Sequence, residues 1–128
     1  MAGVDPKDTR VLVVATCGPD TPERCAAPFF FAQTAAAMGA RVGICFILQS
    51  PLLLKVGVAE NVYAKAEGRP VSYFLRQALQ AGVELHVCDA ALKMVDMSPD
   101  DLIEEADSLV GPNYLIKAGL EADLVLNF

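Results

Sequence analysis

Residues 83–94, Val-Glu-Leu-His-Val-Cys-Asp-Ala-Ala-Leu-Lys-Met, join an apolar strand pattern directly to a helical pattern. The strand is predicted over Val83–Val87, and the helix begins immediately after Cys88. In parallel α/β proteins, ligands and reactive groups collect at the carboxyl ends of the strands. Cys88 therefore occupies the position where such a fold places its chemistry.

Cys88 is the leading candidate for a reactive residue. The free N–H groups and the dipole at the start of a helix stabilise an anion, and the nucleophilic form of cysteine is the thiolate. Asp89 acts in the opposite direction, because it places a negative charge beside the sulfur. The alternative is that Cys88 is a small buried apolar residue, as many free cysteines are.

Four further segments have the composition of strands. Continuous apolar runs rich in β-branched residues predict buried strands over Arg10–Thr16 and Arg41–Ile47, and shorter ones are predicted over Ser108–Val110 and Leu124–Phe128. Helical signals lie between the strands. They predict a helix over about Pro28–Met38 that is capped by Gly39, a short helix over Ser50–Lys55, and a helix that begins at Pro70 and stops at Gly82. A fourth helix is predicted to begin at the capping box Ser98-Pro99-Asp100-Asp101 and to bury Leu102, Ile103 and Ala106. A fifth is predicted over about Pro112–Ala118, ending at Gly119.

This alternation predicts a single α/β domain over residues 1–128. We expect a flavodoxin-like, doubly wound sheet of about five mainly parallel strands with helices on both faces. In the flavodoxin order 2-1-3-4-5, strands one and three are neighbours. Cys17 and Cys88 follow these two strands, so they are predicted to face one crevice.

The other cysteines are ranked by their positions. Cys17 lies in a loop at a strand end and is a possible second thiol. Cys25, near a helix start, and Cys45, inside the second strand, are expected to be structural. The spacings contain no CxxC pair, which disfavours a zinc site.

The single histidine, His86, shares a strand face with Cys88 but lies about 7 Å away along the strand. It is predicted to be a packed histidine rather than a catalytic base. Asp96, Asp100, Asp101, Glu104 and Glu105 form an acidic cluster, predicted to be a solvated helix face rather than a metal site.

Composition excludes several other classes. Hydrophobic residues make up 54% of the chain, but the longest stretches without a charge, 25–40 and 42–54, are shorter than the roughly 20 residues of a membrane span. The net charge of −6 argues against direct nucleic-acid binding. Because GxGxxG and Walker loops are missing, no cofactor is expected. The polar amino terminus predicts a cytoplasmic protein with reduced cysteines.

Four stretches, in order, resemble the DsrE/DsrF-like sulfur-relay family. The loop Cys17–Cys25 is similar to its Gly-Pro loop, 28–39 to its alanine-rich first helix, 42–47 to its second strand, and 82–103 to the region holding its strand-end cysteine. That cysteine corresponds to Cys88. Gln49-Ser50-Pro51 departs from the family pattern, in which many members have an Asp-Gly or Trp-Gly turn.

The resemblance implies a carrier that holds sulfane sulfur as a persulfide on Cys88 and passes it between a donor and an acceptor protein. It also implies a trimer or hexamer. Two alternatives remain open. One is a thiol-based regulatory module with a Cys17–Cys88 disulfide, and the other is a non-catalytic assembly subunit.

Overall fold

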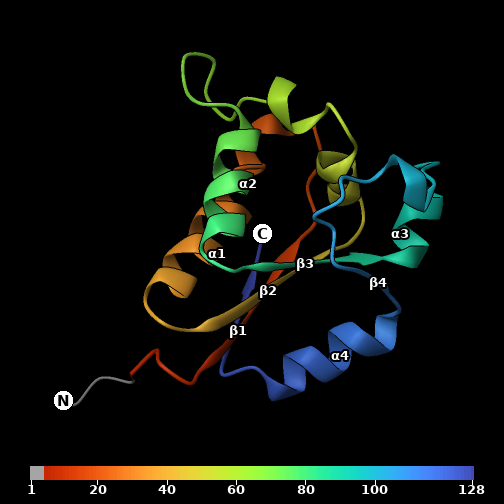
Figure 1. Ribbon diagram of the computed structural model, residues 1–128. Coiled ribbons are helices and arrows are strands. Elements are labelled where there is room, and N and C mark those ends of the chain that lie inside the picture. Colours follow the sequence, from red (N-terminus) through yellow and green to blue (C-terminus); the bar gives the residue numbers. More distant parts are fainter. Residues whose placement is uncertain (1–4) are drawn as a thin grey trace.

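The computed structural model describes residues 5–128, and its strands form one fully parallel sheet in the order β4-β3-β2-β1-β5 (Figure 1). The strands are β1 (Arg10–Ala15), β2 (Arg41–Phe46), β3 (Glu84–Cys88), β4 (Ser108–Val110) and β5 (Leu124–Asn127). Each lies within a residue of its predicted position. The predicted parallel α/β class is confirmed.

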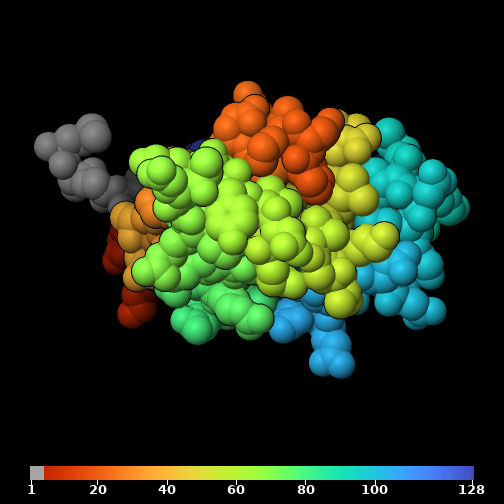
Figure 2. Space-filling view, turned by 90° about the horizontal axis from the view of Figure 1, so that it is seen from above, coloured from red at the N-terminus to blue at the C-terminus, as the bar shows by residue number. Residues whose placement is uncertain are grey.

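Helices cover both faces of the sheet, as predicted (Figure 1). The α-helices are α1 (Ala27–Ala37), α2 (Val71–Gln80), α3 (Asp89–Met94) and α4 (Pro112–Glu121), and the 3-10 turns are η1 (Pro22–Arg24), η2 (Ser50–Leu54), η3 (Ala59–Asn61) and η4 (Pro99–Asp101). Helices α1 and α2 lie on one face and α4 lies on the other. Seen from above, α2 and the segment leading into it cover the middle of the first face (Figure 2).

The predicted strand order 2-1-3-4-5 is wrong, because β2 lies between β1 and β3. The register places Ala15 beside Phe46 and Phe46 beside Val87. The predicted order requires the first two crossover helices on opposite faces, but α1 and α2 pack against each other on the same face. The chain therefore advances one strand at a time from β1 to β4. It reverses once, through α4, and returns to place β5 beside β1.

The side chains pack into two unequal cores. The larger core lies under α1 and α2, and its largest fully buried side chains include Phe29, Phe46, Ile44 and Leu85. The smaller core lies under α4 and contains Leu12, Val14 and Cys45. Strands buried on both faces explain the high apolar content of the chain.

The segment after the capping box is not a helix, which corrects the prediction for 98–106. The box itself is present, since the Ser98 N–H donates to the Asp101 carboxylate at 2.8 Å. Leu102 then forms an antiparallel bridge with Lys55, and the Ile103 N–H donates to the Leu54 carbonyl at 2.9 Å. This pairing uses backbone groups that a helix would need. The acidic cluster therefore does not form a helix face.

Helix α4 continues through Gly119 to Glu121, so the predicted end at Gly119 is also wrong. A Cβ on Gly119 would lie 3.9 Å from Cδ2 of Leu12, which shows that this glycine faces β1. It permits close packing of helix on sheet and does not terminate the helix. Gly39 and Gly82, in contrast, have φ of 105° and 90° just after α1 and α2, as their predicted capping roles require.

Candidate functional site

Cys88 is half-buried at the carboxyl end of β3, directly opposite Val110 of β4. Strand alternation directs its side chain toward the α4 face, because Leu85 and Val87 belong to the core under α1 and α2. Helix α3 begins at the next residue, Asp89. The structure thus places Cys88 at the strand-to-helix junction predicted from the sequence.

Cys45 is a buried thiol on the same face as Cys88. It pairs in register with His86, and only 1% of its surface is exposed. Burial raises the pKa of the Cys45 thiol to about 11, and the nearby Cys88 sulfur adds to this rise. Cys45 is therefore protonated at neutral pH and does not compete with Cys88 as a nucleophile.

Cys17 and Cys88 do not end neighbouring strands, which corrects the argument for a shared crevice. With β2 between them, β1 and β3 are two strand spacings apart, or about 10 Å. A disulfide generally needs Cα atoms closer than about 7 Å. The Cys17–Cys88 disulfide of the regulatory alternative therefore does not fit this arrangement of strands.

Cys17 instead lies near Cys25. The Cys25 thiol is fully buried and points back toward the start of the loop, where it donates to the Gly18 carbonyl at 3.1 Å. Burial raises the pKa of Cys25 to about 11, with further contributions from Cys17, Asp20 and Glu23. Cys25 helps to fold the loop that presents half-buried Cys17.

The segment that follows β2, which we call the rim, lies between the carboxyl end of β1, near Cys17, and the carboxyl end of β3, at Cys88. Leu48 has a φ of 55°, an uncommon conformation for a residue other than glycine. The chain then folds back so that the buried Ser50 hydroxyl lies 2.7 Å from the Ala15 carbonyl and 2.8 Å from that of Ile47. Its single proton serves both acceptors and fixes this segment to β1.

The Gly-Pro loop packs closely on this rim. A Cβ on Gly18 would lie 2.7 Å from the Gln49 carbonyl oxygen, so a larger residue there would displace one of the two segments. The departure from the family pattern at Gln49-Ser50-Pro51 thus falls on the contact between two loops at the carboxyl edge. Sequence reasoning missed the anchoring role of Ser50, although a polar residue just past a buried strand was a usable signal.

His86 is a packed strand histidine, as predicted. Its Nδ1 lies 2.7 Å from Ser108 Oγ, its ring centroid lies 4.8 Å from that of Tyr114, and Nε2 lies 3.5 Å from a Glu84 carboxylate oxygen. Its hydrogen-bond partner is Ser108 rather than Cys88, and among residues 5–128 its buried Nε2 has no hydrogen-bond partner. His86 therefore holds β4 and α4 against β3.

Among residues 5–128, no group of three or more His, Cys, Asp or Glu side chains is arranged to hold a metal ion. Within the same range, no helix has both the length and the apolar character that a membrane span needs.

We expect the two buried thiols to make the fold sensitive to alkaline pH. Cys25 and Cys45 have folded pKa values near 11, above the ordinary value of 9.0, so their stabilising effect is complete below pH 9. It is lost as the pH rises through 11, because the unfolded chain releases these protons first. Each shift corresponds to roughly 2 to 3 kcal/mol. Urea unfolding from pH 7.5 to 11 under reducing conditions measures the decline.

Cys45→Ala provides the control for this prediction. This variant lacks one of the two titrating thiols, so its stability should fall less steeply above pH 9 than that of the wild type, whatever its stability at pH 7.5. Parallel pH profiles would contradict a contribution from Cys45.

The fold and the strand-end thiol define a class: a small parallel α/β domain with a cysteine at the carboxyl end of a strand. The chain matches the DsrE/DsrF-like family over residues 9–128. It belongs to the DsrE/DsrF-like family.

Solved structures support the same fold. The YchN protein from E. coli superimposes with a TM-score of 0.76 at 17% sequence identity, covering 94% of this chain and 99% of that protein. MTH1491, a protein of unknown function from Methanobacterium thermoautotrophicum, gives a TM-score of 0.68 at 15% identity, covering 94% of this chain and 100% of its own. The search of curated protein sequences returned no match. At these identities, the structural similarities establish the fold alone.

Proposed function

We propose that this protein is a sulfur carrier that binds sulfane sulfur as a persulfide on Cys88 and passes it to a protein partner. The observation that carries the proposal is the position of Cys88 as a half-buried thiol at the end of β3 in a DsrE/DsrF-like fold. Cys25 and Cys45, in contrast, are buried and have raised pKa values. Cys17 is the remaining half-buried thiol, and its proposed role is that of a second carrier thiol.

The proposed chemistry is two successive thiol exchanges. The Cys88 thiolate attacks the outer sulfur of a donor persulfide, forming Cys88–S–SH and releasing the donor thiolate. A thiolate of the acceptor protein then attacks the outer sulfur of Cys88–S–SH, takes up that sulfur and releases the Cys88 thiolate. One sulfur atom moves in each step, and the protein is unchanged after both.

The proposed partners are a sulfur-donor and a sulfur-acceptor protein, acting in sulfur oxidation or in thiolation. We place the protein in the cytoplasm, because a carrier thiol must be kept reduced between transfers. The net charge of −6 favours protein partners over direct contact with nucleic acid.

Loading with polysulfide tests the proposal. The reduced wild-type protein is incubated with polysulfide, its thiols and persulfides are alkylated, and the intact mass and the Cys88 peptide are measured. A gain of about 32 Da per sulfur on that peptide is expected for a persulfide. A disulfide-forming regulatory module would take up no sulfur and would leave two cysteines unalkylated, with a loss of about 2 Da once the alkyl groups are subtracted. Full alkylation without added sulfur would favour an assembly subunit without a carrier thiol.

We also propose that the chain assembles as a homotrimer or hexamer through α4 and β5. Ile116 and Leu120 on α4 are 65% and 83% exposed, and Leu124 and Val125 on β5 are 49% and 39% exposed. β5 is an edge strand with unpaired backbone groups on its outer side. Apolar side chains gathered beside an open strand edge are typical of protein contacts.

Leu120→Asp is expected to weaken this assembly, because it would bury a charge in an apolar contact. Size-exclusion chromatography with light scattering should show a smaller mass for the variant than for the wild type. Val56→Asp, at a site that is 66% exposed in the connection after η2, is the matched control and should leave the mass unchanged. Equal masses for Leu120→Asp and wild type would refute the role of α4.

A further inference from the structure

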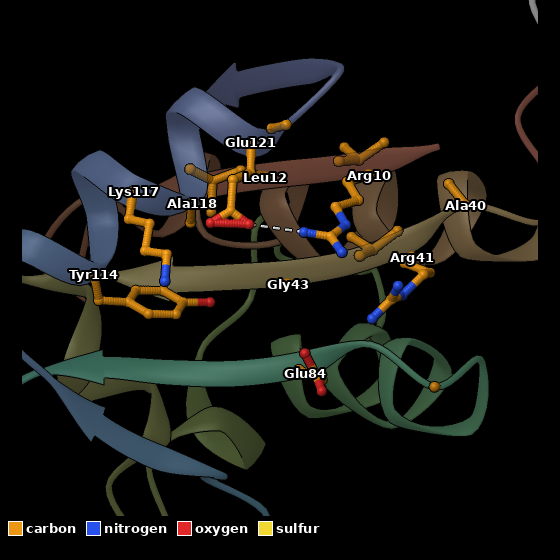
Figure 3. A pocket seen from close by; sticks show the side chains of 14 residues that line it. Arg10, Leu12, Ala40, Arg41, Gly43, Glu84, Tyr114, Lys117, Ala118 and Glu121 are labelled. Atoms are coloured by element: carbon orange, nitrogen blue, oxygen red, sulfur yellow. Dashed lines mark hydrogen bonds and ion pairs between the residues drawn. The ribbon is translucent and has the colours of Figure 1, made fainter. Parts of the chain in front are cut away.

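A cavity of about 500 Å³ lies between α4 and the amino-terminal ends of β1, β2 and β3 (Figure 3). The cavity lies at the amino-terminal ends of the strands, because Arg10, Arg41 and Glu84 are the first residues of their strands. Cys88 lies at the opposite, carboxyl-terminal end of β3. Cavities of this size accommodate small organic molecules. It is therefore a candidate binding site separate from the proposed sulfur carrier.

Small residues create this space. Gly43 of β2 lies on the sheet side of the cavity, and the facing side includes Ala118 of α4 and Ala122, which directly follows that helix. A Cβ on Gly43 would lie 3.8 Å from the Tyr114 hydroxyl, so the tyrosine reaches across the glycine. Together with Leu12, these small residues form the apolar part of the cavity wall.

Positive charge collects around the cavity although the whole chain is acidic. Arg10, Arg41 and Lys117 are three of only ten Lys and Arg residues in a protein of net charge −6. Arg10 forms an ion pair with Glu121 at 2.9 Å, which closes one side of the cavity (Figure 3). Among residues 5–128, Arg41 and Lys117 have no carboxylate partner within 4.0 Å.

The cavity therefore offers two unpaired cations and a hydroxyl donor. Burial is the largest of the effects that raise the pKa of Tyr114, so its hydroxyl keeps its proton and can donate. Glu84, whose side chain is 67% exposed, lies at the rim and near His86. Guanidinium and ammonium groups bind carboxylates through charge-assisted hydrogen bonds.

We propose that this cavity binds a small organic anion, with its carboxylate held by Lys117 beside the Tyr114 hydroxyl and its apolar body packed against Gly43, Leu12 and Ala118. The apolar wall distinguishes such a ligand from a free inorganic ion. Because the chain as a whole has a net charge of −6, an anion is attracted to the cations of this cavity more strongly than to the rest of the protein.

Ligand-detected saturation-transfer NMR tests the proposal with benzoate as the probe. Benzamide is the uncharged isostere, and inorganic phosphate is the anion without an apolar body. Benzoate is expected to bind, and benzamide to bind at least about tenfold more weakly, since each 1.4 kcal/mol of lost interaction is a factor of ten. Equal binding of benzoate and benzamide would overturn the proposal, and so would phosphate displacing benzoate at equal concentration.

Variants then locate the binding site. Lys117→Gln should weaken benzoate binding about tenfold, as expected for loss of a charge-assisted hydrogen bond, whereas Arg41→Gln, at the other end of the cavity, should weaken it less. Lys93→Gln on α3, the same charge change far from the cavity, should leave it unchanged. Ala118→Leu should reduce binding by filling the cavity, and circular dichroism checks that each variant folds. Wild-type affinity in Lys117→Gln would show that benzoate binds elsewhere.

Discussion

Cys88→Ser is expected to abolish stable uptake of sulfur from polysulfide at the β3 end, reducing the added mass there to background. Serine has nearly the same shape, but its hydroxyl does not form a persulfide, because the reacting species is a thiolate. The side chain is only half-buried, so this replacement should leave the fold intact. Intact mass after loading and alkylation measures the loss, and a urea unfolding curve confirms stability.

Cys17→Ser is the matched control, since it makes the same atomic change at the other half-buried cysteine. It should load as the wild type does if Cys88 is the carrier. If Cys88→Ser loads fully and Cys17→Ser does not, the carrier role belongs to Cys17. If the two single variants each lose half of the added sulfur, both thiols carry it independently.

The positions of the strands could be predicted from the sequence, because strands buried on both faces are made of apolar residues. Segments such as Arg41–Phe46 are apolar on both faces, and this pattern occurs in strands covered on both sides. The order of the strands was not predictable in the same way. It depends on the contact between α1 and α2, and side-chain periodicity within a helix does not identify its neighbour.

In the candidate site, too, local positions could be predicted from the sequence, whereas contacts between distant segments could not. The position of Cys88 at a strand-to-helix junction follows from the local pattern of residues 83–94 and is present in the structure. The partners of the cysteines depend on strand order, so Cys17 was predicted beside Cys88 but lies near Cys25. The helix predicted after Ser98 failed for a related reason, because Leu102 pairs with Lys55, 47 positions earlier in the chain.

Phe46→Ala is expected to lower the free energy of unfolding by about 3 to 5 kcal/mol, the usual cost of removing a buried phenylalanine side chain. Phe46 is fully buried on the central strand β2, where it pairs with Ala15 and Val87. Its ring centroid lies 5.7 Å from that of Phe29 on α1, so the substitution would leave a cavity between helix and sheet. Urea unfolding monitored by circular dichroism measures the change.

Phe30→Ala provides the same chemical change at a site that is 50% exposed on α1. Since about half of that side chain is already in water, its loss should cost about 1 kcal/mol or less. The free energy of unfolding of domains this size is typically about 5 to 15 kcal/mol, so Phe46→Ala removes a large part of it whereas Phe30→Ala does not. Equal losses in the two variants would contradict the burial of Phe46 and the central position of β2, on which the arrangement of the cysteine-bearing edge depends.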